Sequence, residues 1–220
     1  DLKQWLPEHT ECTIFADDIT CSVSAKTEEE VVIGLEETSR NVLAYMASNG
    51  LCINAKKTNF LICRPKRVKI KKKTIHIGDD DVVEKDVISL LGFQLNRHLT
   101  WDDQLDGLVM ALNQRYGILK ALRSKIRGKS LVQVAHGIFL GKLHFGLAAF
   151  GKLRITETDK HNGQMQTLQI LLNDVMRLLT NQRIPEHVAI DSLHNETGFD
   201  SLNRILAKAI LLETWKIRQD

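Results

Sequence analysis

Four consecutive residues, Phe15-Ala16-Asp17-Asp18, carry the sharpest chemical signal in this sequence of 220 residues. Apolar, β-favouring residues flank them, so the pattern from Thr13 to Val23 predicts a β-hairpin with the aspartates at its turn. Two adjacent carboxylates repel each other, and a bound divalent cation removes that repulsion. Mg²⁺ prefers oxygen ligands and often shares its shell with substrate phosphates, as in two-metal nucleotidyl transfer. The alternative is a solvated turn, because Asp is a common turn residue.

The segments after this turn predict the elements that would support it. Thr27 followed by Glu30 forms a capping box, and apolar residues at helical spacing continue until Asn49-Gly50, so we expect one helix from about Glu28 to Ser48. Short β-rich pieces follow at 51–53, 60–63, 68–70, 74–77 and 87–95. The first part of the chain therefore belongs to the α+β class.

Beyond Trp101 the apolar residues change to helical spacing. We expect a first helix with a stripe from Leu105 to Ile126 that ends at Gly128, and a second helix capped by Ser130. Further apolar stripes predict helices around 165–179 and 202–212, and Pro185 is expected to open a short helix between them. Gly137, Gly141 and Gly146 interrupt the second helix, which suggests close helix approach. The second half is predicted to be a helical bundle.

Four motifs in order give the chain a family resemblance. The Phe15-Ala16-Asp17-Asp18 turn, the segment GLCINAKKT at 50–58, LGF at 91–93 and LTWD at 99–102 resemble the reverse transcriptase of non-LTR (LINE-type, jockey-like) retrotransposons. Looser similarity continues through 143–146, 168–177 and 201–216 to the region after the polymerase. The resemblance implies a partial palm with the primer-grip region at 1–100, thumb helices at 101–155 and a C-terminal helical region at 156–220.

The resemblance also implies roles for individual residues. Asp17 and Asp18 match the catalytic, metal-holding pair of the palm, and Lys57 matches a lysine beside the leaving pyrophosphate. Gly92, with Leu91 and Phe93, matches the primer grip that contacts nucleic acid. The cofactor would be Mg²⁺ or Mn²⁺ in the complete enzyme, and the partners an RNA template and a DNA primer. A plain surface lysine and ordinary core packing are the alternatives for Lys57 and for Leu91 and Phe93.

The chain also departs from the family pattern. Family members carry a further metal-binding Asp on an earlier palm strand, whereas only sixteen residues precede Asp17. We therefore expect either the C-terminal part of a larger polymerase, inactive alone and partnered by the missing N-terminal portion or other subunits, or a shortened descendant. The competing hypothesis is a retroelement-derived, non-catalytic nucleic-acid-binding or scaffold subunit of a larger assembly.

A basic run and an acidic segment follow each other in the first half. The run RPKRVKIKKK at 64–73 holds seven cations, Arg64, Lys66, Arg67, Lys69, Lys71, Lys72 and Lys73. Such a cluster is expected to bind phosphate backbone without sequence preference. The segment 79–86 has a net charge of −4 from five carboxylates and one lysine. The alternative is therefore a solvated hairpin whose cations pair with that acidic segment.

Composition narrows the class of protein without naming a function. The net charge of +3 is too small to identify a nucleic-acid binder by itself. The longest apolar stretches fall short of the roughly 20 residues that span a bilayer, so we expect a soluble chain with no membrane partner. No charged-then-apolar leader opens the sequence, and we expect an intracellular protein, nuclear or cytoplasmic. The four cysteines lack a CxxC pair and are expected to be reduced and buried, and the three tryptophans to be core or interface anchors. The scattered histidines predict no zinc site.

Overall fold

The computed structural model describes residues 2–65, 71–154, 163–182 and 189–219. The chain divides into two compact units, of which unit 1 comprises 1–90 and 95–100, and unit 2 comprises 91–94 and 101–220. The regions 101–155 and 156–220 both lie in unit 2. Small antiparallel sheets and helices make the fold mixed α+β, as predicted.

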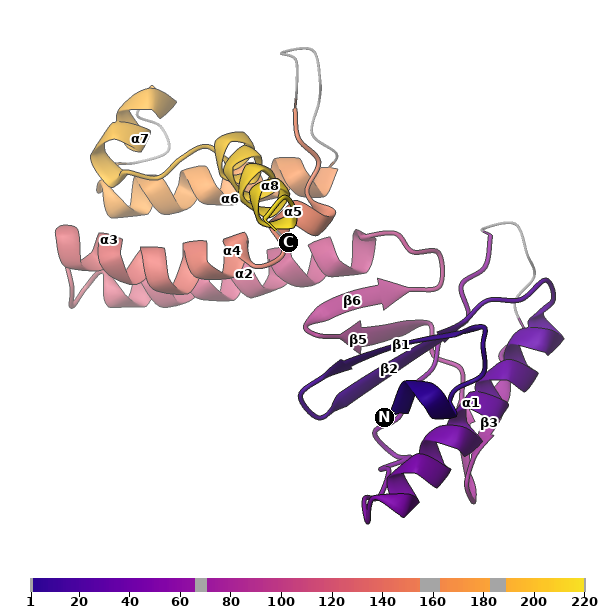
Figure 1. Cartoon of the computed structure of the whole chain (residues 1–220). Helices are drawn as coiled ribbons and strands as arrows, with labels where there is room; N and C mark the ends of the chain where they lie inside the picture. The colour runs from indigo at the N-terminus through magenta and orange to yellow at the C-terminus, as the bar shows by residue number, and fades with distance from the viewer. Residues whose placement is uncertain (1, 66–70, 155–162, 183–188, 220) are drawn as a thin grey trace. The chain divides into compact units, whose positions relative to one another are not determined.

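Unit 1 begins with a short 3₁₀ helix, η1 (Leu2–Trp5), the hairpin of β1 (Thr10–Phe15) and β2 (Asp18–Val23), and helix α1 (Glu28–Ser48) (Figure 1). The predicted capping box is confirmed, because the Thr27 side chain accepts a hydrogen bond from the Glu30 amide at 3.2 Å and the Glu30 carboxylate accepts one from the Thr27 amide at 3.0 Å. Gly50, with φ +69°, follows the C-cap Asn49. Local signals therefore fix both ends of α1.

A second hairpin, β3 (Thr74–Ile77) and β4 (Asp80–Val83), packs its apolar face with α1. The buried cluster there contains Phe60, Ile62, Ile75, Ile77 and Val82. The strand predicted at 74–77 is confirmed, whereas 51–53 and 60–63 form no strand. Residues 60–63 make isolated backbone hydrogen bonds, such as Lys85 N–H to the Phe60 carbonyl at 3.0 Å, rather than a ladder. The strand predicted at 68–70 lies outside the described residues.

The single strand predicted at 87–95 is wrong, because this segment folds back on itself. It forms β5 (Val87–Leu90) and β6 (Phe93–Asn96), joined by Leu91 and Gly92 with φ of +48° and +86°. Positive φ at both central residues is what a two-residue hairpin turn of the I′ type requires. The tip of this hairpin and the first two residues of β6 belong to unit 2, whereas β5 and the last two residues of β6 belong to unit 1.

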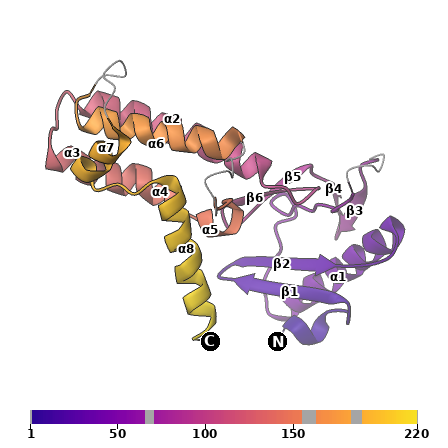
Figure 2. The same ribbon diagram turned by 90° about the horizontal axis from the view of Figure 1, so that it is seen from above.

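Unit 2 is helical, as predicted. Its helices are α2 (Asp102–Leu122), α3 (Lys129–Ala135), α4 (Gly141–His144), α5 (Leu147–Phe150), α6 (Gly163–Leu179), α7 (Ile190–Thr197) and α8 (Leu202–Ile217), with a π-helical segment η2 (His136–Leu140) between α3 and α4. Helices α2 and α6 run side by side in both ribbon views (Figures 1 and 2). The core between the helices is apolar and includes Leu112, Phe139, Leu172 and Leu206, each fully buried.

Three expectations for the helices need correction. Helix α2 ends at Leu122 instead of continuing to Gly128, and Gly128 rather than Ser130 is the N-cap of α3. A Cβ on Gly137 would meet nothing within 4 Å, so no neighbouring helix approaches closely enough to require glycine at this position. Gly146 lies outside the helix, with φ +67°, and its close neighbour is the ring of Phe93. The short helix expected at Pro185 lies outside the described residues.

The cysteines are free, as expected, but Cys52 and Cys63 are exposed rather than buried. Trp101 packs against the core of unit 2, which confirms its predicted role, whereas Trp215 is 61% exposed. Among the described residues, no helix combines the length and the apolar character needed to cross a membrane.

Candidate functional site

The β1–β2 hairpin places the two aspartates at its tip. Phe15 pairs with Asp18, so Ala16 and Asp17 form a two-residue connection. Both common two-residue turns need a positive φ at the first of these positions, which favours Gly. Ala16 holds φ +53° there in spite of its Cβ. Backbone strain of this kind costs about 1–3 kcal/mol and clusters at functional sites.

The tip projects its polar groups away from α1. At the end of the hairpin far from the tip, Thr10 pairs with Val23, and both side chains face α1. Thr10 Oγ1 lies 2.9 Å from Thr38 Oγ1 of α1, and a Cβ on Gly34 of α1 would lie 2.7 Å from Val23 Cγ1. Side chains alternate along a strand, so Phe15 and Asp18 lie on the other face. Asp17 and Asp18 are both exposed, and Phe15 is 64% exposed. Water or a ligand can therefore reach the carboxylates.

The two carboxylates at the tip can be compared with the ligand preference of a divalent cation. Two carboxylates suit the oxygen preference of Mg²⁺ or Mn²⁺, and water or phosphate commonly fills the other positions of an octahedron. Within the described ranges, no group of three or more His, Cys, Asp or Glu side chains is placed to hold a metal ion. The ligand chemistry of Asp17 and Asp18 is compatible with such an ion, and the described side chains do not add a third carboxylate, His or Cys ligand beside them.

Lys57 lies in a turn after α1. Its amide donates to the Asn54 carbonyl at 3.0 Å, and its carbonyl accepts from Asn59 Nδ2 at 3.0 Å. Its side chain is exposed, and no hydrogen bond or ion pair of the described residues joins it to Asp17 or Asp18. The structure therefore does not bring the three predicted catalytic residues together through direct contacts.

Arg64 does not belong to the basic surface that the sequence predicts. Its side chain is 2% exposed, and its guanidinium binds Glu84, whose side chain is 0% exposed, and Glu28 at 2.8 Å. Burial raises the pKa of Glu84, but the hydrogen bonds from Arg64 and from the Lys73 amide outweigh burial and bring that pKa below its usual value. Arg64 is thus an internal counter-ion and has no free donor face for phosphate.

The other described cations of the run are partly engaged with acidic residues. Lys72 pairs with Asp86 at 3.0 Å and Lys73 with Glu29 at 3.2 Å, as the alternative of pairing between the two segments anticipates for Lys72. Lys71 and Lys72 are exposed. Lys66, Arg67 and Lys69 lie outside the described residues. The described part of the run therefore offers two exposed ammonium groups rather than a row of seven cations.

Gly92 sits against an aromatic group in unit 2. A Cβ at this position would lie 3.1 Å from Phe145 Cζ, and Phe145 stacks on Phe93 with ring centroids 5.3 Å apart. Phe93 also meets Trp101 and Phe150 edge-on, at 6.2 and 6.4 Å. These contacts hold the β5–β6 tip on the α4–α5 region and give core packing as a sufficient reason for Gly92 and Phe93. Sequence reasoning missed this group, although the Leu-Gly pair inside an apolar run is a possible turn signal.

Two thiols face each other on β1 and β2. Cys12 and Cys21 are directly opposite in the hairpin register. Burial, reinforced by the neighbouring Cys12 thiol, raises the pKa of Cys21 to about 12. A thiol with such a pKa remains protonated at neutral pH and is a poor nucleophile. Cys21 is therefore part of the hairpin packing rather than a reactive centre.

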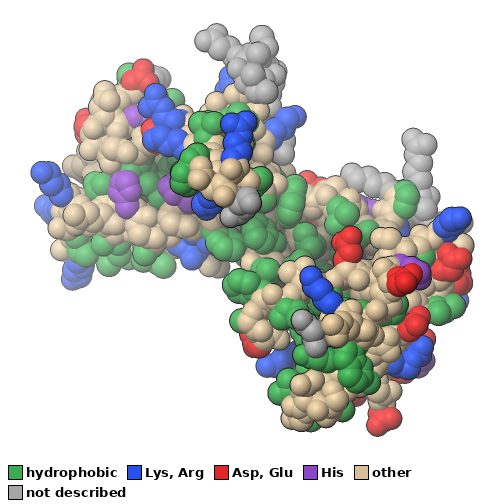
Figure 3. Space-filling view, viewed as in Figure 1, with side chains coloured by type: hydrophobic (Ala, Val, Ile, Leu, Met, Phe, Trp, Pro, Cys, Tyr) green, Lys and Arg blue, Asp and Glu red, His purple; other side chains and the backbone are tan. Residues whose placement is uncertain are grey.

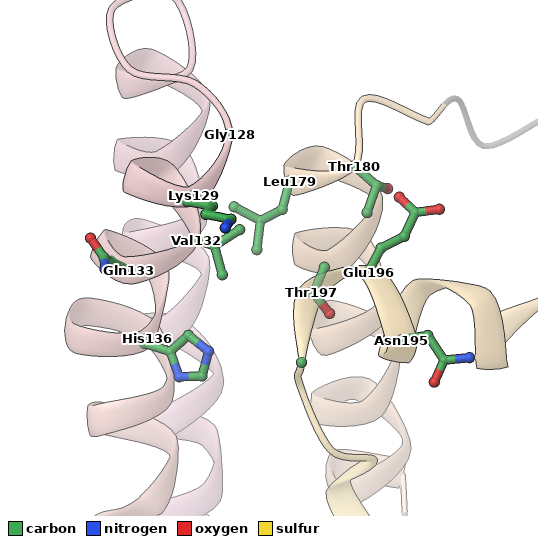
Figure 4. Close-up of a pocket in the computed structure, with 11 residues that line it drawn as sticks. Gly128, Lys129, Val132, Gln133, His136, Leu179, Thr180, Asn195, Glu196 and Thr197 are labelled. Atoms are coloured by element: carbon green, nitrogen blue, oxygen red, sulfur yellow. The ribbon is translucent and has the colours of Figure 1, made fainter.

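Unit 2 also has an open cavity of about 610 Å³ between α3, the end of α6 and α7 (Figure 4). Its lining combines apolar surface with polar side chains, among them Lys129, Gln133, His136, Thr180 and Glu196. Lys129 and Glu196 contribute opposite charges from α3 and α7. None of the residues predicted for the site lines this cavity.

Comparison with known proteins adds no relative to this description. No family model matches the sequence, and neither the search of curated proteins nor that of solved structures finds a match.

Proposed function

We propose that this chain is the C-terminal part of a retrotransposon-type RNA-directed DNA polymerase, which in its complete form extends a DNA primer on an RNA template. The observation that carries the proposal is the exposed Asp17-Asp18 pair at a two-residue turn, with Ala16 in a left-handed conformation. The ordered similarity of the segments at 50–58, 91–93 and 99–102 supports it.

The proposed chemistry assigns each residue a limited part. Asp17 and Asp18 would hold Mg²⁺ or Mn²⁺, which would supply positive charge to stabilise the negative charge that develops during phosphoryl transfer. The primer 3′-hydroxyl would give its proton to water as its oxygen attacks the α-phosphorus of a deoxynucleoside triphosphate. The new P–O bond forms while the bond from the α-phosphorus to the bridging oxygen breaks, and pyrophosphate leaves. Lys57, on its exposed turn, stabilises or protonates that leaving group. Lys71 and Lys72 contact backbone phosphates.

A cross-linking experiment tests the position of the primer end. An RNA–DNA hybrid carries a photoreactive group on the 3′-terminal deoxynucleotide of its DNA strand, and the cross-linked peptides of the 220-residue chain are mapped by mass spectrometry. We expect Mg²⁺-dependent cross-links within 15–19 that decrease in the Asp17→Asn, Asp18→Asn variant. Cross-links confined to other peptides, or equally strong without metal, would contradict the proposal.

The basic run has its own test. Lys71→Glu with Lys72→Glu should weaken binding of the hybrid at all sequences and flatten its salt dependence, because phosphate contacts position without specifying sequence. Lys3→Glu with Lys26→Glu is the matched control, since both lysines are exposed in unit 1. Equal affinity and salt slope in the test and control pairs would favour the solvated hairpin.

The second candidate is the non-catalytic, retroelement-derived subunit. The buried ion pairs of Arg64 and the surface ion pairs of Lys72 and Lys73 favour it, because cations that are bound to carboxylates of the chain are less available to hold a substrate. It predicts that the hybrid gives no metal-dependent cross-link at the β1–β2 tip, and that the chain co-purifies with a stable protein partner.

A further inference from the structure

A long stretch of unit 2 contains Lys and Arg but no acidic residue. Residues 107–156 contain nine Lys and Arg side chains and no Asp or Glu, although the net charge of the whole chain is only +3. Five of the nine fall within ten residues, namely Lys120, Arg123, Lys125, Arg127 and Lys129. Counting net charge by window reveals this stretch, whereas the overall balance hides it.

The fold gathers these five cations around one corner. Helix α2 ends at Leu122 and α3 begins at Lys129, so the cations occupy the last turn of α2, the connection and the start of α3. Lysine and arginine side chains are visible at the end of unit 2 where α2 gives way to α3 (Figure 3). Lys120, Lys125, Arg127 and Lys129 are exposed, and we call these four residues the α2–α3 basic surface.

The α2–α3 basic surface is poorly neutralised. No ion pair of the described residues includes any of its members. Lys120 Nζ lies 4.4 Å from the centroid of the Tyr116 ring, and the neighbouring Arg123 donates a hydrogen bond to the Asn181 side chain. Glu196 is the acidic residue that shares the cavity lining with Lys129 (Figure 4). The surface thus differs from the run at 64–73, where acidic residues neutralise several cations.

We infer that the α2–α3 basic surface binds the phosphate backbone of a nucleic-acid duplex without reading its sequence. Lys and Arg side chains that contact phosphates release condensed counter-ions, which drives such binding. A protein partner would bury large apolar or aromatic anchors. Here Leu122 and Ile126 pack instead against the core of unit 2, and no large hydrophobic side chain within 120–129 is exposed. Charge without exposed apolar anchors favours a polyphosphate strand.

The choice of nucleic acid as the polyanion that binds this surface rests on the proposed function. The charge distribution of the surface is independent of that function. Binding is measured by fluorescence anisotropy with a 20-base-pair RNA–DNA hybrid and the full 220-residue chain, at several salt concentrations. In the variant Lys125→Gln, Arg127→Gln, Lys129→Gln, three lost phosphate contacts should lower the slope of log affinity against log salt by about 2.7. Affinity at 0.1 M salt should fall by about tenfold or more.

The matched control removes three charges elsewhere in unit 2. Arg204, Lys208 and Lys216 are exposed on α8, and their replacement by Gln gives the same change in net charge. We expect the control to keep the wild-type slope. Wild-type affinity and slope in the test variant, or an equal loss in the control, would overturn the inference. So would poly-glutamate that competes as well as the hybrid at equal charge, since that result indicates an acidic protein partner.

A double variant tests the inference even if the triple variant fails to fold. Lys125 and Arg127 lie in the connection outside both helices, so Lys125→Gln, Arg127→Gln removes no helical residue and should lower the slope by about 1.8. An unchanged slope in this variant also counts against the inference. If only the polymerase proposal fails, the cross-links at 15–19 disappear while these variants still weaken hybrid binding; if only this inference fails, the cross-links remain.

Discussion

Replacing Arg64 by Met removes the cation from a buried group of three charged side chains. Arg64 lies 2.8 Å from a Glu28 oxygen, and its Nη2 lies 3.0 Å from Glu84 Oε2. The Glu84 side chain is 0% exposed, whereas that of Glu28 is 31% exposed, so water can replace the cation only at Glu28. Breaking a buried pair costs about 3–5 kcal/mol because the remaining charge is left uncompensated. We expect unit 1 to lose stability in this range at pH 7.

Hydrogen exchange reports on unit 1 separately from unit 2. Peptides that cover β3 and β4 should exchange about 10²-fold faster or more in Arg64→Met, since each 1.4 kcal/mol corresponds to a factor of ten. The double variant Arg64→Met, Glu84→Leu removes the stranded carboxylate and should recover most of the protection. Wild-type exchange in the single variant, or no recovery in the double variant, would refute the reasoning.

The pH dependence follows from Glu84. In the wild type its folded pKa is lowered, so its contribution to stability is present above the unfolded pKa of about 4.3 and is lost as pH falls through the folded pKa. In Arg64→Met, burial remains without the guanidinium, so we expect the folded pKa of Glu84 to rise above the unfolded one. The stability deficit of the variant should therefore shrink as pH falls from 7 to 5. A deficit that is constant over this interval would show that Glu84 is not the stranded charge.

Three further predictions concern single residues. Asp17→Asn should leave the thermal stability of the metal-free chain equal or slightly higher, since the repulsion between the two carboxylates falls. The wild-type chain should bind Mg²⁺ or Mn²⁺ with millimolar-order affinity. It should incorporate no nucleotide in a primer-extension assay. Cys21 should react with maleimide at pH 8 far more slowly than the exposed Cys52, because its pKa is raised to about 12, and mass spectrometry of labelled peptides measures the difference. Gly146→Ala should cost about 2–5 kcal/mol in denaturant unfolding, since the new Cβ would meet an aromatic ring of β6 at a positive φ, whereas Gly137→Ala, which meets nothing, should cost little.

The sequence predicts best where a structure depends on neighbouring residues. Thr27 and Glu30 define the start of α1 through two local hydrogen bonds, and Gly50 accepts the left-handed conformation after its end. The hairpin at 87–96 was missed because its turn signal is confined to Gly92, whereas Leu91 before it is not a residue that favours positive φ. Its positive φ is maintained by the fold around the tip, where Phe93 and Phe145 stack. Tertiary packing overrides local preference at this position.

Arg64 shows why the candidate site was only partly predictable. A run of seven cations looks uniformly exposed, yet Phe60, Ile62 and Arg64 are buried at alternate positions, so Arg64 continues an inward-facing row. This period of two was visible in the sequence. The acidic partners Glu28 and Glu84, which make the position tolerable for a cation, lie 36 and 20 residues away and could not be inferred from the run itself.

The two units therefore differ in how their charges are used. In unit 1, Arg64, Lys72 and Lys73 are bound to carboxylates, and a cation that stays in such an ion pair neutralises no phosphate and adds nothing to the salt slope. In unit 2, the α2–α3 basic surface has no described ion pair, so its contribution to the salt slope should approach the full value for each phosphate contact. If the chain binds a duplex, each cation at the α2–α3 corner should therefore add more to its salt dependence than Lys72 or Lys73 does. The carboxylates at the β1–β2 tip would then act on a strand that other parts of the protein hold.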